Sequence, residues 1–464
     1  MIKIFNHYFH RGSLLQIALD LVLISLAVVL ALYLESKGVH ASAMVFWDGV
    51  SRGFVMALGV VSVNSALGFY DGHHKTTTPA MRARAVLSCG VAGFVALGVL
   101  LVWPFSAQYS TRWLVLAVML LTGLLLAHRV LRGPTLPESL IRRKVLVFGT
   151  GTRAQSVGKF LKQTSSGVEL IGYLASPNER EAEVSAWGIL DPNERLTDVV
   201  KRHGVDEIVV ALSERRGGSM PMRELLDCKL NGVSVSDIAT YFEHNLGQIR
   251  LDSVSAGWLI FGDGFNQGFV RSLVKRWFDI VGACVLLVVT LPFMLITALA
   301  IALESRGPIF YRQPRVGLNG AVFDVVKFRS MRTDAEKDGV PRWASAGDSR
   351  ITRVGRIIRK VRIDELPQLF SVLKGDMSLV GPRPERPFFV DQLTQEIPYY
   401  AVRHSVKPGV TGWAQVSYHY GASVEDTSAK LQYDLYYVKN HSLVLDLVIL
   451  FETVGVVLTG KGAQ

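Results

Sequence analysis

The chain has 464 residues, of which 49% are hydrophobic and 19% are charged, and its formal net charge is +11. Soluble domains commonly carry about a quarter charged residues, so this composition excludes a disordered chain and argues against a wholly soluble one. Three cysteines without CxxC spacing form neither a disulfide framework nor a thiolate metal site. The basic charge indicates anionic partners, and the apolar excess favours phospholipid or a phosphorylated substrate over nucleic acid.

Apolar runs follow one another through the first 135 residues of the chain. They cover residues 14–34, 53–70, 85–102 and 113–127. Each is long enough, or nearly so, to cross a hydrocarbon core of about 30 Å as a helix. The first run is too long for a signal peptide and no small-residue cleavage site follows it, so we expect it to be retained. The sequence therefore predicts a four-helix transmembrane bundle over residues 1–135.

Basic residues in the short loops indicate how this bundle is oriented. They gather before the first run, between the second and third, and after the fourth, at Lys3, Arg11, Lys75, Arg82, Arg84, Arg129, Arg132, Arg142, Arg143 and Lys144. Loops rich in Lys and Arg stay in the cytoplasm, so both ends of a multi-pass bundle are expected there. Apart from Asp20 the runs contain almost no ionisable group, which favours an anchor over an ion or proton path.

Residues 136–265 have the pattern of a Rossmann-like α/β domain. A β-branched run at 144–148 leads into a Gly-x-Gly-x-x-Ala turn made by Gly149, Gly151 and Ala154, and a helical pattern follows. Such a turn lets the backbone approach a phosphate at a helix N-terminus. Further strands are expected at 169–174, 206–212 and 233–238, which together predict a parallel sheet.

The second of these strands lacks the acidic end that NAD binding requires about 20 residues after the turn. It ends Leu174-Ala-Ser176, whereas Glu169 stands at its beginning, and no Tyr-x-x-x-Lys pair follows. Redox and epimerase chemistry are therefore not expected. A nucleotide or nucleotide-sugar sensing site and a structural domain that forms a homodimer both remain open.

A further apolar run, residues 280–303, is long enough to span a membrane and carries Pro292 near its middle. Both of its flanks are basic, with Arg271, Lys275 and Arg276 before it and Arg306, Arg312 and Arg315 after it. A spanning helix would leave one basic flank on the wrong side, whereas a helix bent at proline returns both to the cytoplasm. We predict a re-entrant hairpin over 277–304. The alternative is a plain fifth span with the C-terminal third outside the cytoplasm.

Four clusters of basic, proline and glycine residues mark the C-terminal domain, which we place at 266–464. They are Lys327-Phe-Arg329-Ser-Met331, the stretch from Arg359 to Leu369, Gly381-Pro-Arg383-Pro-Glu385, and the stretch from His404 through Lys407 to Gln415.

The second cluster contains the adjacent carboxylates Asp364 and Glu365. Because proline is tolerated in the first turn of a helix, Pro367 predicts a helix from about Asp364 to Leu373, capped by Gly375. The carboxylates would then lie at the positive end of the helix dipole among several cations. Such a pair suits a Mg²⁺ ligand beside a carboxylate that attacks phosphorus. A capped helix with surface ion pairs is the alternative.

The stretch from Lys275 to the C-terminus resembles the bacterial sugar transferases, which are monotopic polyprenyl-phosphate sugar-1-phosphate transferases. Ordered strings carry the resemblance: Lys275-Arg-Trp-Phe-Asp279, Lys327 to Met331, Asp364-Glu-Leu-Pro-Gln-Leu369, Leu373 to Pro384, Lys407 to Gln415 and Asp434 to Asn440. The whole chain resembles the large subgroup that primes exopolysaccharide, capsule or O-antigen synthesis. We therefore expect a membrane protein of mixed α and α/β class, with a mainly helical catalytic domain on the re-entrant helix.

The resemblance implies transfer of a sugar-1-phosphate from a UDP-sugar, with glucose or galactose as leading candidates, to undecaprenyl phosphate with release of UMP. It makes Asp364 the nucleophile of a ping-pong route through an aspartyl-phosphosugar, and Glu365, with Asp364, the ligand of Mg²⁺. It assigns substrate and phosphate contacts to Lys327, Arg329, Arg359, Arg362, Arg383 and Lys407, and includes Asp434 without a defined role. It implies that Lys275, Arg276 and Asp279 anchor the hairpin bent at Pro292, where basic residues meet anionic headgroups.

The implied partners are the UDP-sugar, undecaprenyl phosphate, membrane lipids and a second copy of the chain, and the implied location is the cytoplasmic face of the bacterial inner membrane. Two other functions stay open. One is a membrane scaffold of a polysaccharide-assembly complex that senses a nucleotide without catalysis. The other is a glycosyltransferase that inverts at the sugar carbon and releases UDP.

Overall fold

The computed structural model describes most of the chain in two compact units, one mainly within residues 9–245 and one mainly within 246–464. The described residues are 2–4, 7–9, 11–35, 43–66, 143–164, 168–176, 183–185, 188–191, 194–212, 220–252, 268–333, 350–418 and 423–459, with scattered positions between 90 and 124 and between 254 and 265. The division after residue 245 precedes the expected boundary at 265, because Ile249 is buried in the core of the second unit.

Two long apolar helices follow a short ribbon at the N-terminus. The ribbon consists of β1 (Ile2–Ile4) and β2 (His7–Phe9), and the helices are α1 (Arg11–Glu35) and α2 (Ala43–Ala66). The helices pack on each other through buried side chains such as Ile24, Val28, Met56, Ala57 and Val60. They account for the first two apolar runs. The third and fourth runs lie largely outside the described residues, so the four-helix bundle stays a prediction.

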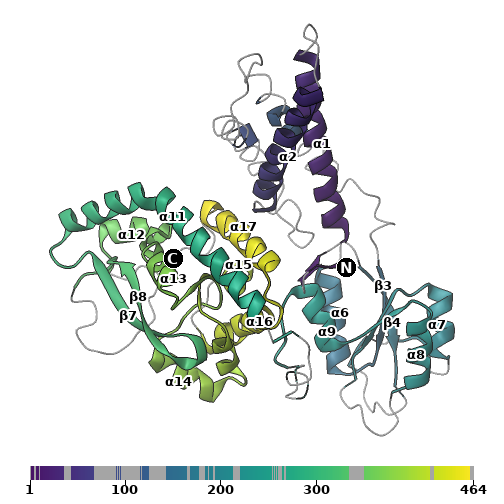
Figure 1. The fold of residues 1–464 in the computed structure, drawn as a ribbon. Helices are drawn as coiled ribbons and strands as arrows, with labels where there is room; N and C mark the ends of the chain where they lie inside the picture. Colours follow the sequence, from purple (N-terminus) through teal and green to yellow (C-terminus); the bar gives the residue numbers. More distant parts are fainter. Residues whose placement is uncertain are drawn as a thin grey trace. The chain divides into compact units, whose positions relative to one another are not determined.

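The first unit also contains a four-stranded parallel sheet in the order β4-β3-β5-β6. Its strands are β3 (Arg143–Phe148), β4 (Val168–Leu174), β5 (Glu207–Val210) and β6 (Ser234–Asp237). Its helices are α6 (Thr152–Thr164), α7 (Leu196–His203), α8 (Met222–Leu230) and α9 (Ile238–Leu246). Figure 1 shows α6 and α9 on one side of the sheet and α7 and α8 on the other. The predicted parallel α/β sheet is confirmed.

The glycine turn of this sheet joins β3 to α6 as predicted. Gly149 has a φ of +128°, which glycine tolerates and other residues rarely adopt, and its amide donates to the carbonyl of Leu174 at 2.8 Å. Ala154, in the first turn of α6, is fully buried. The amide of Glu183 donates to the carbonyl of Thr150 at 2.9 Å, so a later segment of the same chain lies against the turn.

The second unit is mainly helical around one two-stranded antiparallel ribbon and one two-stranded parallel pair. Its strands are β7 (Phe310–Val316), β8 (Val322–Phe328), β9 (Ser378–Val380) and β10 (Gly409–Thr411). Its α-helices are α11 (Gly268–Glu304), α12 (Arg353–Lys360), α13 (Gln368–Lys374), α14 (Pro387–Glu396), α15 (Trp413–Ser417), α16 (Val424–Asn440) and α17 (Leu443–Thr459). Shorter 3₁₀ turns are η2 (Leu318–Gly320), η3 (Ile363–Glu365) and η4 (Tyr400–Ser405). Its core joins α13, β9, α14, α16 and α17.

The long helix α11 covers the predicted re-entrant segment. Within the described part of the chain, it is the one helix whose length and composition suffice to cross a membrane. It exposes large apolar side chains along its length, including Trp277, Val288 and Leu303. The structure keeps it as a single helix with Pro292 inside, and Figure 1 shows that coil bending along its course. Whether it enters and leaves on one side of a membrane stays a prediction.

The helix predicted from Asp364 to Leu373 is divided in the structure. Arg362, with a φ of +58°, ends α12, the turn η3 carries both carboxylates, and α13 begins at Gln368. Pro367 has no amide hydrogen, so the α-helical bond from residue 367 to residue 363 cannot form. The predicted cap at Gly375 is confirmed, with a left-handed φ of +102°.

Candidate active site

Three parts of the second unit contribute cations to the Asp364–Glu365 pair. Lys327 comes from β8, and Arg383 comes from the loop that follows β9. The carboxylate of Glu365 accepts hydrogen bonds from both. Lys327 Nζ lies 3.0 Å from Oε1, Arg383 Nη2 lies 2.7 Å from Oε1, and Arg383 Nη1 lies 3.4 Å from Oε2. Arg362 lies 4.0 Å from the same Oε1. Two cations that are remote in sequence, Lys327 and Arg383, and one nearby cation, Arg362, thus surround one carboxylate.

This environment determines the ionisation of Glu365. Burial alone would raise its pKa, but the charges of Arg383 and Lys327 and the hydrogen bonds from Arg383 outweigh burial and hold the pKa well below its ordinary value. Burial lowers the pKa of Lys327, and the Glu365 carboxylate opposes that effect. Glu365 is therefore an ionised, rigidly held carboxylate.

Asp364 is buried next to Glu365 but in a different environment. Its Oδ1 is shielded from solvent and has no hydrogen-bond partner among the described residues. Burial, followed by repulsion from Glu365, raises its pKa to about 6, although Lys327, Arg359 and Arg383 act in the opposite direction. A desolvated carboxylate with an unpartnered oxygen is a reactive nucleophile once it loses its proton.

The residues present fit a divalent cation shared with a substrate. Among the described residues no group of three or more His, Cys, Asp or Glu side chains could hold a metal by itself. Mg²⁺, however, is usually held by one or two carboxylates together with substrate phosphates. The unpartnered oxygen of Asp364 and the carboxylate of Glu365 supply hard oxygen donors of this kind.

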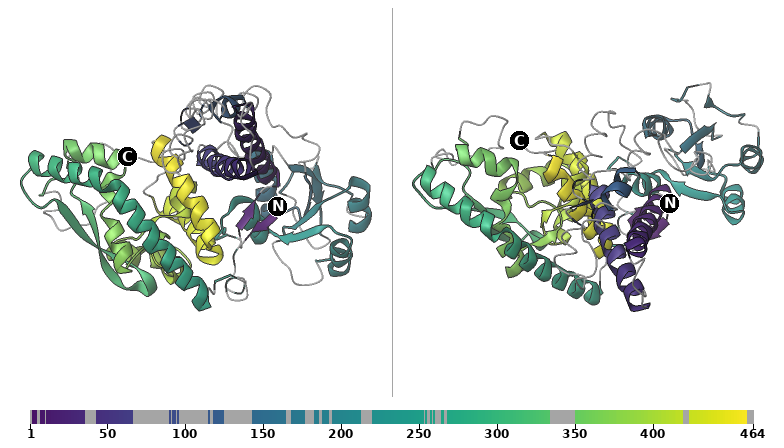
Figure 2. Two further views of the ribbon diagram at one scale, coloured as in Figure 1. Left: turned by 45° about the horizontal axis from the view of Figure 1, so that its top comes forward. Right: turned by 90° about the horizontal axis from the view of Figure 1, so that it is seen from above.

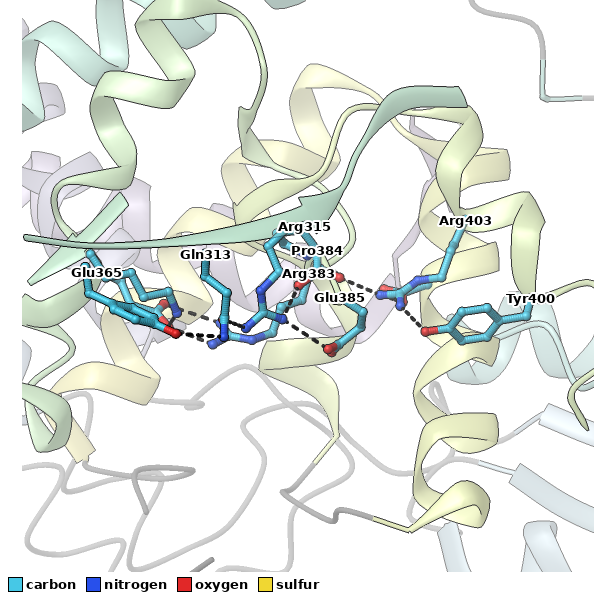
Figure 3. Close-up of polar contacts among 11 residues, drawn as sticks. Gln313, Arg315, Glu365, Arg383, Pro384, Glu385, Tyr400 and Arg403 are labelled. Atoms are coloured by element: carbon cyan, nitrogen blue, oxygen red, sulfur yellow. Dashed lines mark hydrogen bonds and ion pairs between the residues drawn. The ribbon is translucent and has the colours of Figure 1, made fainter. Parts of the chain in front are cut away.

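Sequence reasoning missed a row of polar residues along β7 and the neighbouring loop (Figure 3). Arg315 Nη1 donates to the carbonyl of Pro384 at 3.0 Å and lies 3.2 Å from Oε2 of Glu385, while Nη2 donates to Oε1 of Gln313 at 2.6 Å. In the sequence Arg315 belongs to the basic flank that follows the apolar run 280–303. Its place one residue before the end of β7 was the available signal.

Arg403 was missed as well, although it directly precedes the fourth cluster. Nη2 of Arg403 donates to the backbone carbonyl of Arg383 at 2.8 Å and lies 2.8 Å from Oδ2 of Asp434, and Nη1 donates to the Tyr400 hydroxyl at 2.7 Å. Figure 3 shows the Arg403 guanidinium directed toward Tyr400 and the loop of Arg383. Asp434, which the resemblance includes without a defined role, therefore forms an internal ion pair with Arg403.

Two further predicted phosphate contacts lie elsewhere. The guanidinium of Arg329 donates at 2.7 and 3.1 Å to the carbonyls of Ser305 and Arg306, which directly follow the last residue of α11. Lys407 lies beside Arg276 at the C-terminal end of α13, and burial lowers its pKa. The contacts described for these two residues do not involve Asp364 or Glu365, and the phosphate contacts expected of both remain a prediction.

The three expected headgroup contacts on α11 face the protein instead. Arg276 donates to the carbonyls of Val372 and Leu373 at 2.6 and 2.7 Å, which satisfies the end of α13. Lys275 Nζ lies 3.3 Å from Oδ1 of the buried Asp279 and 2.8 Å from Oδ2 of Asp446 on α17, which runs beside α11 (Figures 1 and 2). Buried carboxylates need a cation nearby, so these residues attach α11 to the catalytic unit.

The remaining predicted residues divide between the two units. Arg359 lies on α12, close enough for its charge to act on Asp364. The glycine turn of Gly149, Gly151 and Ala154 belongs to the first unit and is described above by itself. A nucleotide role for that turn remains a prediction.

Comparison with known proteins identifies the families and relatives that this chain resembles. The profile of the bacterial sugar transferase family matches residues 270–460, and that of a CoA-binding domain matches residues 65–221. An undecaprenyl-phosphate glucose phosphotransferase of Komagataeibacter xylinus is 33% identical over 79% of this chain and 69% of that protein. A UDP-glucose:undecaprenyl-phosphate glucose-1-phosphate transferase of Xanthomonas campestris pv. campestris is 32% identical over 81% of this chain and 79% of that protein.

A third relative shows stronger identity over a shorter stretch. The UDP-N-acetylgalactosamine-undecaprenyl-phosphate N-acetylgalactosaminephosphotransferase of Aeromonas hydrophila is 46% identical over 52% of this chain, and the match spans 56% of that protein's length. The family predicted from the C-terminal strings is thus confirmed by relatives matched over most of both chains. The chain belongs to the bacterial sugar transferase family.

Proposed function

We propose that the chain transfers a sugar-1-phosphate from a UDP-sugar to undecaprenyl phosphate, releasing UMP, as the priming step of exopolysaccharide, capsule or O-antigen synthesis. The observation that carries this proposal is the contrast within one carboxylate pair. Asp364 is buried with an unpartnered oxygen, and Glu365 is held by two cations. The names of the relatives, which give glucose and N-acetylgalactosamine as the transferred sugars, support the reaction class.

The proposed reaction has two displacements at one phosphorus. An oxygen of ionised Asp364 attacks the phosphorus that bears the sugar, the bond from that phosphorus to the oxygen of UMP breaks, and UMP leaves with the electron pair. A phosphate oxygen of undecaprenyl phosphate then attacks the same phosphorus. The bond to Asp364 breaks, the carboxylate is restored, and the lipid carries the sugar diphosphate. This route needs no redox partner and no net proton transfer.

The cations around the pair supply the electrostatic part of this proposal. A carboxylate approaching a diphosphate meets like charge, so preorganised positive groups are needed where the charge develops. Lys327 and Arg383 hold Glu365 and also act on Asp364, while Arg359 and Arg362 come from the neighbouring α12 and its end. Mg²⁺, held by Glu365 with Asp364, would neutralise charge on the diphosphate.

The membrane part of the proposal concerns α11. We place its exposed apolar face in one leaflet, bent at Pro292, with both ends and the catalytic unit on the cytoplasmic side. The exposed apolar surface supports this, as do the ion pairs that attach the helix to the unit carrying Asp364. A soluble donor and a lipid whose phosphate lies at the bilayer surface could then reach the same carboxylates.

The experiment is a nucleotide-release assay on the purified full-length chain in lipid nanodiscs with Mg²⁺, undecaprenyl phosphate and separate UDP-sugars. The sugars are glucose, galactose, N-acetylglucosamine and N-acetylgalactosamine, and Asp364→Asn is the control. We expect UMP from at least one donor and none from the variant. UDP as the product would establish the inverting glycosyltransferase instead. No nucleotide release with any donor, from a protein shown to be folded, would favour the scaffold function.

A further inference from the structure

The guanidinium of Arg403 lies in the protein interior, with 6% of the residue exposed. Its hydrogen bond from Nη1 to the Tyr400 hydroxyl and its ion pair with Asp434 hold it in place. A buried cation is tolerated when it is paired. Nη1 and Nη2 of Arg403 are both used, whereas its Nε has no hydrogen-bond partner among the described residues. The remaining contact of Nη2, at 2.8 Å, is the backbone carbonyl of Arg383, whose side chain donates hydrogen bonds to Glu365.

The loop around Arg383 is held at successive carbonyl groups. Arg383 stands between Pro382 and Pro384, which restrict its backbone. The carbonyl of Pro382 accepts from the amide of Gly409 at 3.0 Å, and the carbonyl of Pro384 accepts from Arg315 at 3.0 Å. With the bond at Arg383 itself, three consecutive carbonyls are each held by a donor from a different element: β10, η4 and β7.

The direction of the Arg383 side chain depends on this anchoring. Its guanidinium reaches Glu365 with two nitrogens, at 2.7 and 3.4 Å, and forked contacts of this kind tolerate little displacement of the backbone. A misplacement of about 1 Å at a catalytic group can lower a rate by about 100-fold.

We propose that Arg403, held by Tyr400 and Asp434, positions Arg383 against the catalytic carboxylates. These three are positioning residues, since their described contacts are with one another and with the loop and not with Asp364 or Glu365. The inference rests on the proposed transfer function. It also gives Asp434 a definite part, as the counter-ion that keeps the anchor buried.

The mildest test is Tyr400→Phe, which removes a single buried hydroxyl from the full-length protein. We expect kcat for UMP release to fall by about 10-fold while KM for the UDP-sugar changes by less than about twofold, because Arg383 loses its alignment and not its charge. Arg403→Lys keeps a cation beside Asp434 but loses the fork, so its kcat should fall further.

Tyr437→Phe is the matched control. Tyr437 is buried to the same degree in the same unit, and its hydroxyl lies 2.8 Å from Oδ1 of Asp446 and 2.9 Å from the carbonyl of Val380. Its loss should lower the melting temperature about as much as Tyr400→Phe does, with kcat within about twofold of the starting protein. An equal loss of kcat in both variants would mean a general packing effect and would overturn the proposal.

A double-mutant cycle separates positioning from stability. If Tyr400 acts through Arg383, adding Tyr400→Phe to Arg383→Ala should lower kcat no further. A second 10-fold loss in that background would overturn the proposal.

Hydrogen exchange of the peptide spanning 381–386 provides a readout without activity: it should accelerate in Tyr400→Phe and not in Tyr437→Phe. If the wild-type protein releases no UMP but exchange still accelerates in Tyr400→Phe, the proposed function is refuted and the anchoring stands. Unchanged exchange in Tyr400→Phe would refute the anchoring.

Discussion

Asp364 and Glu365 are neighbours in the chain and equally buried, yet their carboxylates have opposite surroundings. Glu365 accepts from Lys327 and Arg383, whereas Oδ1 of Asp364 has no hydrogen-bond partner among the described residues. The 3₁₀ turn that carries both, with Pro367 just after it, directs two successive side chains into different environments. One carboxylate is thus kept ionised, and the other is kept desolvated and poised to react.

The first prediction concerns pH. In the proposed reaction Asp364 attacks as a carboxylate, and its pKa is raised to about 6, so kcat/KM should fall as pH drops through about 6 and level off above about 7.5. Glu365 stays ionised throughout, because its cations hold its pKa well below the ordinary value. Arg359→Gln removes a charge that lowers the pKa of Asp364, so the fall of kcat/KM on the acidic side of the pH profile, its acidic limb, should move to higher pH. Arg356→Gln, on the exposed side of α12, is the control. A limb that moves to lower pH in Arg359→Gln would contradict this account.

The second prediction concerns stability. The pKa of Asp364 is raised in the folded state from 3.8 to about 6, so the ionised carboxylate costs folding free energy above about pH 6 and this cost disappears as the group takes a proton below that. Each pKa unit corresponds to about 1.4 kcal/mol. Asp364→Asn should therefore stabilise the protein by about 1–3 kcal/mol at pH 7.5 while abolishing transfer. Asp391→Asn, at an exposed carboxylate, should do neither. Urea unfolding at pH 7.5 measures the free energy of unfolding of both variants. A destabilised Asp364→Asn would count against the burial argument.

The third prediction concerns the geometry of Arg383. Lysine keeps the charge but has one donor group in place of the planar fork, so Arg383→Lys should lower kcat by about 10- to 100-fold. Arg386→Lys, three residues on, makes the same chemical change away from Glu365 and should leave kcat within about twofold. Steady-state UMP release measures both. Retention of full activity in Arg383→Lys would show that charge alone suffices.

The fourth prediction distinguishes two roles of Lys275. Its ammonium lies beside the buried carboxylates of Asp279 and Asp446. Removing one partner of a buried ion pair typically costs about 3–5 kcal/mol, so Lys275→Met should destabilise the protein by about that amount. Flotation with liposomes should be unchanged, and Lys275→Met combined with Asp446→Asn should recover part of the loss. Normal stability with lost flotation would instead restore the headgroup role.

Much of the fold and the centre of the site could be predicted, because the signals are local. The succession of expected strands and helices, together with the Gly149 turn, predicted the parallel sheet. The motif strings predicted Asp364, Glu365, Lys327 and Arg383 as residues of the site. The errors come from packing between distant segments. Lys327 and Arg329 are two residues apart, but Arg329 lies beyond the end of β8 and reaches the end of α11.

The same reason explains the residues on α11 and η4. A basic flank beside an apolar run indicates lipid contact, and nothing in the local sequence shows that Asp446, on the last helix, pairs with Lys275. The pairing of Arg403 with Asp434, on different elements, is equally invisible in either local pattern. Ion pairs of this kind depend on tertiary packing, which no single motif records.

The central claim, that Asp364 forms a covalent phosphosugar, is tested most directly by adding the preferred UDP-sugar without undecaprenyl phosphate. The account predicts a rapid burst of UMP of one equivalent per active enzyme, with the sugar phosphate attached to the peptide that contains Asp364 in mass spectrometry, and no burst from Asp364→Asn. UMP release that requires the lipid acceptor, with no modified peptide, would contradict it.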